Sequence, residues 1–170
     1  MRAVLDTNIV LDLLHFRDPL LRSLQQAIDC RRLQCFTDRD CLAELQRVSA
    51  YPQFRLTAAA QSALLDAYQH FVVACEDEDH GEGDGGAEDP PLPRCRDADD
   101  QKFVLLARRC RADLLLTRDR HLLQLGRRWA RQLPCPILTG SAAGILLAGC
   151  PPQADSGDGE EGRQTRSRGC

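Results

Sequence analysis

Short apolar runs alternate along this chain with stretches of helical periodicity. The runs predict buried strands at 2–5, 33–36, 113–117 and 136–138. Apolar residues that recur every three or four positions predict helices at 9–14, 19–30, 38–49, 57–74, 97–110 and 120–131, with a last apolar segment at 142–147. Strands that alternate with helices are typical of a parallel sheet sandwiched by helices. We therefore expect an α/β fold of three layers, with a parallel sheet in the middle.

This pattern covers residues 1–148, a length that suits one domain with a substantial core. It is interrupted at 76–93, a segment rich in glycine, proline and acidic residues that has almost nothing to bury. We expect a disordered insertion there. Residues 149–170 are polar and rich in glycine, which predicts a disordered C-terminal tail.

The sequence gives no sign of export or of a membrane segment. The first apolar stretch, Ala3 to Leu5, meets Asp6 at once, and no later run approaches the ~18 apolar residues that a membrane span needs. The nine cysteines are odd in number and contain no C-x-x-C pair, so we expect reduced thiols and no zinc site. The sequence therefore predicts a cytoplasmic protein with no membrane partner.

Charge is unevenly distributed along the chain. The net charge is −3, but eight acids and no Lys or Arg lie between Glu76 and Asp89, so the other residues carry +5. Residues 101–131 hold nine basic side chains against two acids, and Arg108, Arg118 and Arg120 are candidates for contacts with a phosphodiester backbone. Solvated helix faces explain such a stripe equally well, so charge alone does not identify a nucleic-acid partner.

Two acids follow predicted strands. Asp6 ends the first strand, and Asp119 lies two residues beyond the strand at 113–117. Ligands of parallel α/β folds gather at the carboxyl ends of the strands, although an Asp in this position is also a common helix N-cap. The polar neighbours Asn8 and Thr117 favour a site over two unrelated caps.

Two further acids lie beside apolar helix positions. Asp100 precedes Phe103 by three residues and heads the apolar stripe of its helix, and Glu44 lies between Leu42 and Leu45. A carboxylate turned toward a core must be paired, protonated or bound to a cation. Helix capping and the helix dipole account for the neighbouring acids Asp97 and Asp99.

No basic side chain is expected to reach these acids, because the chain has a single lysine and the arginines point elsewhere by helical spacing. A shared metal ion is then the simplest partner for Asp6, Glu44, Asp100 and Asp119. Clustered carboxylates suit Mg²⁺ or Mn²⁺, and such ions activate water for attack on phosphorus. The residues predict a phosphodiesterase.

Four segments resemble the motifs of the PIN-domain family, of the kind found as the toxin half of bacterial toxin–antitoxin pairs. They are Val4-Leu5-Asp6-Thr7-Asn8-Ile9-Val10, Cys41-Leu42-Ala43-Glu44-Leu45-Gln46-Arg47-Val48, Cys95-Arg96-Asp97-Ala98-Asp99-Asp100-Gln101-Lys102-Phe103 and Leu116-Thr117-Arg118-Asp119. Ile137-Leu138-Thr139 resembles the closing strand, and the likeness spans about residues 1–148 in the right order. Ala98, where a proline is common, and the acidic insertion depart from the family pattern.

The resemblance implies a sheet of four or five parallel strands, divalent-metal ribonuclease activity with Mg²⁺ or Mn²⁺, an RNA substrate, frequent homodimers and an antitoxin partner. It gives metal-ligand roles to Asp6, Glu44, Asp100 and Asp119. It makes Asn8 and Thr117 supporting residues and Asp97 an auxiliary acid at best.

Two other functions remain open. One is a catalytically idle module that binds RNA or a protein, since a fold does not guarantee activity. The other is a phosphatase of the haloacid-dehalogenase type, which also begins with an Asp after the first strand. That family needs a second Asp where this chain has Asn8, and a Lys that Lys102 is badly placed to supply.

Overall fold

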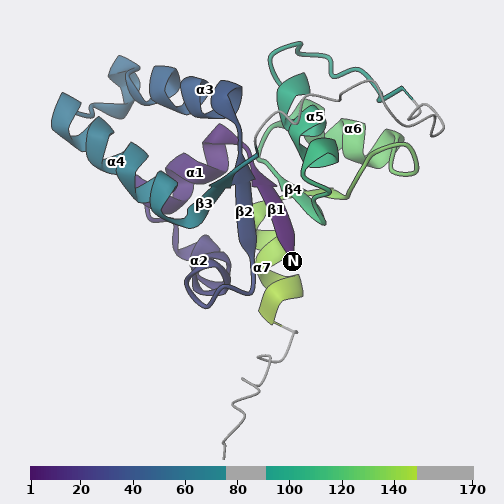
Figure 1. Ribbon diagram of the computed structural model, residues 1–170, viewed down its shortest axis with the longest axis horizontal. Coiled ribbons are helices and arrows are strands. Elements are labelled where there is room, and N and C mark those ends of the chain that lie inside the picture. The colour runs from purple at the N-terminus through teal and green to yellow at the C-terminus, as the bar shows by residue number, and fades with distance from the viewer. Residues whose placement is uncertain (76–90, 149–170) are drawn as a thin grey trace, which may run out of the picture.

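The computed structural model describes residues 1–75 and 91–148, and Figure 1 shows their arrangement. In chain order the elements are β1 (Arg2–Leu5), α1 (Thr7–Leu14), the 3-10 turn η1 (Pro19–Leu21), α2 (Arg22–Asp29), β2 (Gln34–Thr37), α3 (Arg39–Ser49), the 3-10 turn η2 (Pro52–Phe54), α4 (Ala58–Phe71), β3 (Val72–Ala74), α5 (Gln101–Arg109), β4 (Leu114–Leu116), α6 (Arg120–Arg128), β5 (Ile137–Leu138) and α7 (Gly140–Ala148).

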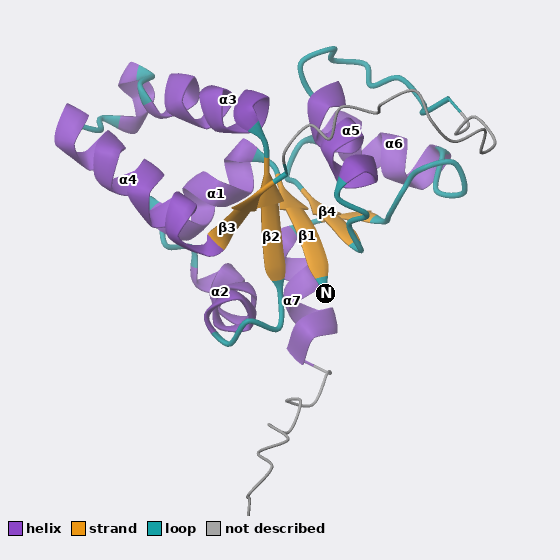
Figure 2. Ribbon diagram, viewed as in Figure 1, coloured by secondary structure: helices purple, strands orange, loops and turns teal. Residues whose placement is uncertain are grey.

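The five strands form one sheet in the order β3-β2-β1-β4-β5, and every neighbouring pair is parallel. β1 lies at the centre, where Val4 pairs with Phe36 of β2 and with Leu115 of β4. Because all strands run in one direction, their carboxyl ends meet at one edge, and the helices surround the sheet in Figure 2. The expected three-layer α/β fold with a parallel sheet is confirmed.

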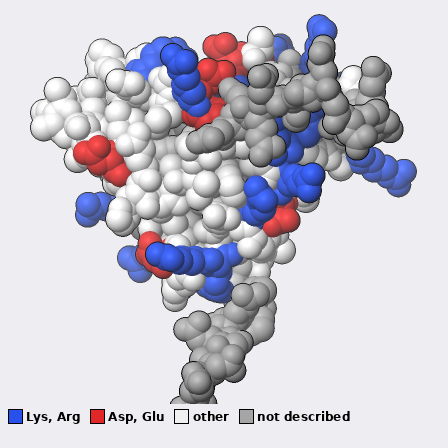
Figure 3. Space-filling view, in the orientation of Figure 1, with Lys and Arg blue, Asp and Glu red and all other residues white. Residues whose placement is uncertain are grey.

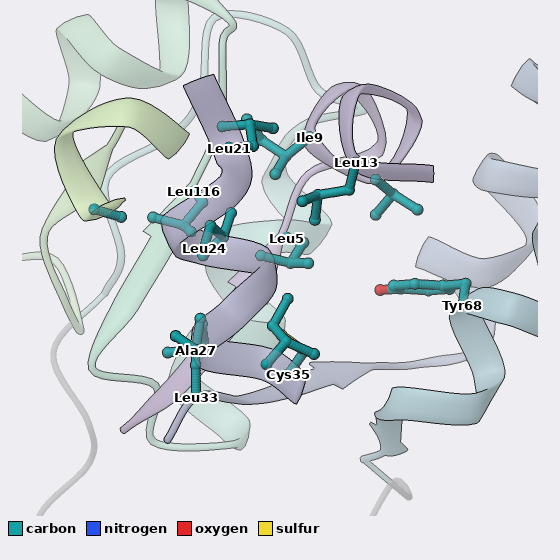
Figure 4. Close-up of a cluster of buried hydrophobic side chains, with 14 of the residues drawn as sticks. Leu5, Ile9, Leu13, Leu21, Leu24, Ala27, Leu33, Cys35, Tyr68 and Leu116 are labelled. Carbon is teal, nitrogen blue, oxygen red and sulfur yellow. The ribbon is translucent and has the colours of Figure 1, made fainter. Parts of the chain in front are cut away.

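Successive strand residues point to opposite sides of the sheet, and an apolar cluster covers each side. Ala3 and Leu5 of β1 face a cluster supplied by α1, α2, α4 and α7, part of which Figure 4 shows. Val4, between them, faces a second cluster supplied mainly by α5 and α6. The strands can therefore be apolar at every position, as the compact runs in the sequence indicated.

The prediction of a helix through residue 74 was wrong at its end. α4 stops at Phe71, and Val72–Ala74 form the edge strand β3, paired with β2. Val72 and Val73 are β-branched and fit a pleated edge better than a helix. This strand brings the sheet to five members.

Two α-helices begin later in the sequence than predicted. Residues 19–21 form a 3-10 turn before α2, and α5 begins at Gln101 rather than at 97. The Asp97 carboxylate instead accepts a hydrogen bond from the Asp99 N–H at 3.0 Å and so closes a local turn. Asp99 is not the N-cap of α5, because Asp100 occupies that position.

The predicted insertion and tail lie mostly outside the described residues. The last positions of the insertion, 91–93, are described. The prediction of disorder was wrong for them, because Leu92 packs against the second core cluster. The carbonyl of Pro93 accepts a hydrogen bond from Gln101 Nε2 at 3.3 Å. The prediction for 76–90 and that for 149–170 concern residues that are not described.

The seven cysteines within the described ranges are all free thiols. Burial raises the pKa of the Cys35 thiol to about 12, so this side chain behaves as a small apolar core residue. Over the same ranges, no helix is both long and apolar enough to cross a membrane.

Candidate active site

Asp6 is fixed where β1 ends. Its N–H donates to the carbonyl of Leu116 at 2.9 Å, which ties the ends of β1 and β4 together. The side chain does not cap α1 and is almost fully buried. Its Oδ2 instead accepts hydrogen bonds from Asn8 Nδ2 at 2.6 Å and from Thr117 Oγ1 at 2.5 Å. The capping interpretation is therefore wrong for Asp6.

Burial raises the pKa of Asp6, and the charge of Glu44 adds to this, whereas the hydrogen bonds from Thr117 and Asn8 act in the opposite direction. These two donors stabilise the ionised form of a carboxylate that burial disfavours. The net effect is a raised pKa, so a nearby cation would favour the ionised form of Asp6.

Thr117 and Asn8 link the two strand ends through their side chains. Thr117 Oγ1 donates to Asp6 and accepts from the N–H of Asp119 at 2.8 Å. Asn8 Oδ1 accepts from the N–H of Arg118 at 2.9 Å. The loop from Thr117 to Asp119 is consequently fixed relative to Asp6.

We expect the Thr117 hydroxyl to matter for activity because it orients two of the candidate acids. Thr117→Val keeps the shape of the side chain but removes these hydrogen bonds. For the ribonuclease activity that the family resemblance implies, it should slow RNA cleavage by roughly 10- to 100-fold. Thr117→Ser restores the hydroxyl and should recover most of the rate. Initial rates at saturating Mn²⁺, with melting temperatures as a check on folding, measure this. A Val variant as active as the Ser variant would show that the hydroxyl does not position the site.

Asp119 is the N-cap of α6. Its Oδ1 accepts from the N–H groups of His121 at 2.7 Å and Leu122 at 3.0 Å. The capping interpretation therefore holds for Asp119. It does not use the whole carboxylate, because Oδ2 has no hydrogen-bond partner among residues 1–75 and 91–148.

Asp100 occupies the N-cap position of α5 but makes no capping hydrogen bond and is half-buried. Its pKa is raised to about 7, first by burial and then by the charges of Asp6, Asp119, Asp97 and Glu44. Acids from separate parts of the sequence thus act on one carboxylate at the carboxyl edge of the sheet. Asp6, Glu44 and Asp119 therefore lie in the same region as Asp100, near enough for their charges to act on it, and so does Asp97.

Glu44 shows that the expectation of no cationic partner was wrong. Lys102 Nζ of α5 forms an ion pair with Glu44 Oε2 of α3, and the two side chains are 21% and 15% exposed. The ammonium group also lies 5.4 Å from the centre of the Phe103 ring. Helical spacing missed this pair because the flexible four-carbon stem of a lysine lets its charge lie far from its backbone. Lys102 is therefore not badly placed relative to the acids, which corrects one objection to a phosphatase.

The donor set fits Mg²⁺ or Mn²⁺ by its chemistry, since every acidic donor is a carboxylate oxygen. Glu44 Oε2 is buried and makes no hydrogen bond of normal geometry despite its ion pair with Lys102. In the described ranges, no three Asp, Glu, His or Cys side chains lie close enough together to hold one metal ion. The pair with Lys102 engages Oε2 of Glu44, so the ammonium group and a cation would compete for this carboxylate.

The three arginines predicted to contact RNA occupy different positions. Arg118 is exposed beside Asp119, with Nη1 bonded to Asp12. Arg120 is exposed on the first turn of α6. Arg108 is half-buried on the last turn of α5, about 12 Å along the helix from Asp100. Figure 3 shows acidic side chains gathered at the top of the molecule, with basic side chains beside them.

Sequence reasoning missed three residues near the site. Lys102 was dismissed, and Asp12 and His121 were not considered. His121 Nδ1 lies 3.8 Å from Asp119 Oδ1, and its Nε2 lies 3.5 Å from Arg96 Nη1. A charged residue inside the run Val10-Leu11-Asp12-Leu13 was the available signal for Asp12, because a buried acid needs a partner.

A hollow elsewhere on the described part of the chain is separate from the acids of this site. It has a volume of about 800 Å³ and is lined by α1, α2, α4 and the residues next to them. Asp18 is its one acidic lining residue, so this cavity lacks the paired carboxylates of the sheet edge.

Comparison with known proteins agrees with this geometry. The family model described as PIN domain matches residues 2–121, more than half of the chain, and covers all four acids. Comparison with curated proteins and with solved structures gives no match. This chain, with its parallel sheet and its acids gathered at one sheet edge, belongs to the PIN-domain family, whose members are typically nucleases.

Proposed function

We propose that this protein is a divalent-metal-dependent endoribonuclease that hydrolyses phosphodiester bonds in RNA. The observation that carries the proposal is the placement of the candidate acids at the carboxyl edge of the sheet, where burial and the charges of Asp6, Asp119 and Glu44 raise the pKa of Asp100. Like charges held together at the carboxyl ends of strands are unfavourable without a cation. A shared strain of this kind is typical of a functional site.

Asp6, Glu44, Asp100 and Asp119 would hold Mg²⁺ or Mn²⁺, directly or through water. When bound, such a cation lowers the pKa of a water molecule and offsets negative charge on the phosphate. The remaining features of the reaction depend on the protein's own side chains.

Asp6 is oriented by Thr117 and Asn8, so its carboxylate is fixed before the substrate arrives. Asp100 is half-buried, and burial together with the neighbouring acids raises its pKa to about 7, so a bound cation would favour its ionised, ligating form. Lys102 brings positive charge to a cluster of acids that would otherwise repel a phosphodiester.

The exposed guanidinium groups of Arg118 and Arg120 flank Asp119 and are suited to phosphate oxygens. An extended polyanion fits this open arrangement better than a small substrate that must be enclosed. RNA rather than DNA is favoured by the resemblance to toxins described above.

Cleavage of labelled single-stranded RNA tests the proposal. The full chain should cut RNA internally with Mg²⁺ or Mn²⁺, lose activity in EDTA and regain it with excess metal. Labelled DNA of the same sequence and a phosphate monoester serve as parallel substrates. Binding without cleavage would support an idle RNA-binding module, and monoester hydrolysis alone would support a phosphatase.

The resemblance adds two partners to the proposal, a small antitoxin protein and a second copy of the chain. Purification together with the product of a neighbouring reading frame tests the first, and light scattering of the purified chain tests the second. An antitoxin should suppress RNA cleavage when bound, whereas an unrelated neighbour should leave it unchanged.

A further inference from the structure

A second ion pair, between Asp12 and Arg118, lies beside the proposed active site. Asp12 is in the middle of α1, among the buried residues Ile9, Val10, Leu11 and Leu13, and its side chain is only 4% exposed. A buried carboxylate is costly unless it is paired and hydrogen-bonded. Asp12 is compensated by Arg118, whose Nη1 lies 2.5 Å from Oδ1 and 2.6 Å from Oδ2.

Hydrogen bonds fix both the backbone and the guanidinium group of Arg118, but its side chain is exposed. Its backbone N–H donates to Asn8, and its neighbours Thr117 and Asp119 are hydrogen-bonded to each other. Its side chain nevertheless remains 60% exposed. All contact with Asp12 is through Nη1, and Nε and Nη2 have no partner among residues 1–75 and 91–148. The guanidinium is therefore fixed in place, with N–H groups that a ligand could reach from solvent.

This position suits a phosphate that flanks the reacting one. Asp12 is six residues beyond Asp6, about 9 Å along α1. A planar guanidinium binds phosphate oxygens through parallel N–H groups, and prior orientation reduces the entropy lost on binding.

We propose that Asp12 is a positioning residue, which orients Arg118 to bind a phosphate of the RNA strand next to the cleaved bond. This proposal rests on the proposed function. It attributes to the pair a local hydrogen-bonding role rather than a long-range attraction, because the two charges largely cancel at a distance.

Arg118 could act through its charge alone or through an orientation fixed by Asp12, and these two roles predict opposite effects of Asp12→Asn. If Arg118 acts only through its charge, removal of the nearby negative charge should strengthen RNA binding. If Asp12 orients Arg118, the same change should weaken RNA binding about tenfold, despite the gain in net positive charge. Arg118→Lys keeps the charge and removes the planar group, so it should also weaken binding about tenfold.

The experiment measures the affinity of the full chain for labelled single-stranded RNA in EDTA, where no cleavage occurs, and then steady-state cleavage with Mn²⁺. Both variants should raise KM with little change in kcat, and the double variant should bind no more weakly than either single one. Arg127→Lys, an exposed change at the far end of α6, is the matched control and should behave as the parent.

Each outcome decides a different point. Unchanged or tighter RNA binding by Asp12→Asn, in a parent that cleaves RNA, would overturn the positioning role and leave the proposed function intact. Should Asp12→Asn fail to fold, Arg118→Lys still decides, because Arg118 is exposed, and parent-like binding would overturn the proposal. A parent that neither binds nor cleaves RNA would overturn the proposed function and this proposal together.

Discussion

Replacing Asp100 by asparagine should slow Mn²⁺-supported RNA cleavage by about 100-fold or more and leave the fold intact. Asparagine has the same shape but neither the charge nor the basicity of the carboxylate. The fold should tolerate the change because Asp100 makes no capping hydrogen bond, although it occupies the N-cap position of α5. The cleavage rate measures activity, circular dichroism measures folding, and the affinity for RNA in EDTA measures substrate binding without cleavage.

Asp99→Asn is the matched control. Asp99 is the adjacent acid, is exposed, and lies outside the group that raises the pKa of Asp100, so its loss should change the cleavage rate less than about threefold. Equal losses in the two variants would indicate a general effect of charge near α5. An Asp100→Asn enzyme that keeps more than about a tenth of the parent rate would remove Asp100 from the catalytic group.

The raised pKa of Asp100 has a second consequence, for stability without metal. Its pKa is about 7 in the folded protein and near 3.8 in the unfolded chain, so between these values the folded state binds more protons. Stability of the metal-free protein should therefore fall as pH rises from about 4 to about 7. Urea unfolding in EDTA at pH 5 and pH 7.5 measures this difference, which Asp100→Asn should reduce.

The sequence predicted the sheet and the positions of Asp6 and Asp119 because both depend on local patterns. Compact apolar runs can only be buried strands or helix segments, and parallel strands bring their carboxyl ends together. β3 was missed because Val72–Ala74 extend an apolar helical pattern without a breaker. Pairing with the edge of β2 decides their conformation, and that partner is more than thirty residues away.

The contacts between the acids and their partners could not be predicted in the same way. Glu44 and Lys102 come from α3 and α5, and the length of the lysine side chain makes its direction independent of helical spacing. Asp119 could not be assigned to one role, because a single carboxylate can cap a helix with Oδ1 and leave Oδ2 available. Asp12 was passed over because its partner, Arg118, is 106 residues away.

Binding of Mn²⁺ or Mg²⁺ should raise the melting temperature of the parent protein at neutral pH. The ion binds the folded cluster and not the dispersed acids of the unfolded chain, so it stabilises by RT ln(1 + [L]/Kd). At a hundredfold excess over Kd this is about 2.7 kcal/mol, or roughly 5 to 10 °C for a chain of this size. Asp6→Asn and Asp100→Asn should lose most of this gain, and neither should melt below the parent when metal is absent.

Lys102→Gln distinguishes the effect of the metal ion on stability from that of the Lys102 ammonium group, which already pairs with Glu44. Without metal this variant should melt below the parent, because Glu44 loses its ion pair while remaining largely buried. With Mn²⁺ its gain in melting temperature should exceed that of the parent, because no ammonium group competes for the Glu44 carboxylate. Asp119→Ala loses an N-cap as well as a metal ligand, so without metal it should be destabilised by roughly 0.5–2 kcal/mol, and with metal it should also lose part of the gain. If Mn²⁺ leaves the parent unchanged while Asp6→Asn and Asp100→Asn melt lower, the carboxylates stabilise the fold and do not form a metal site.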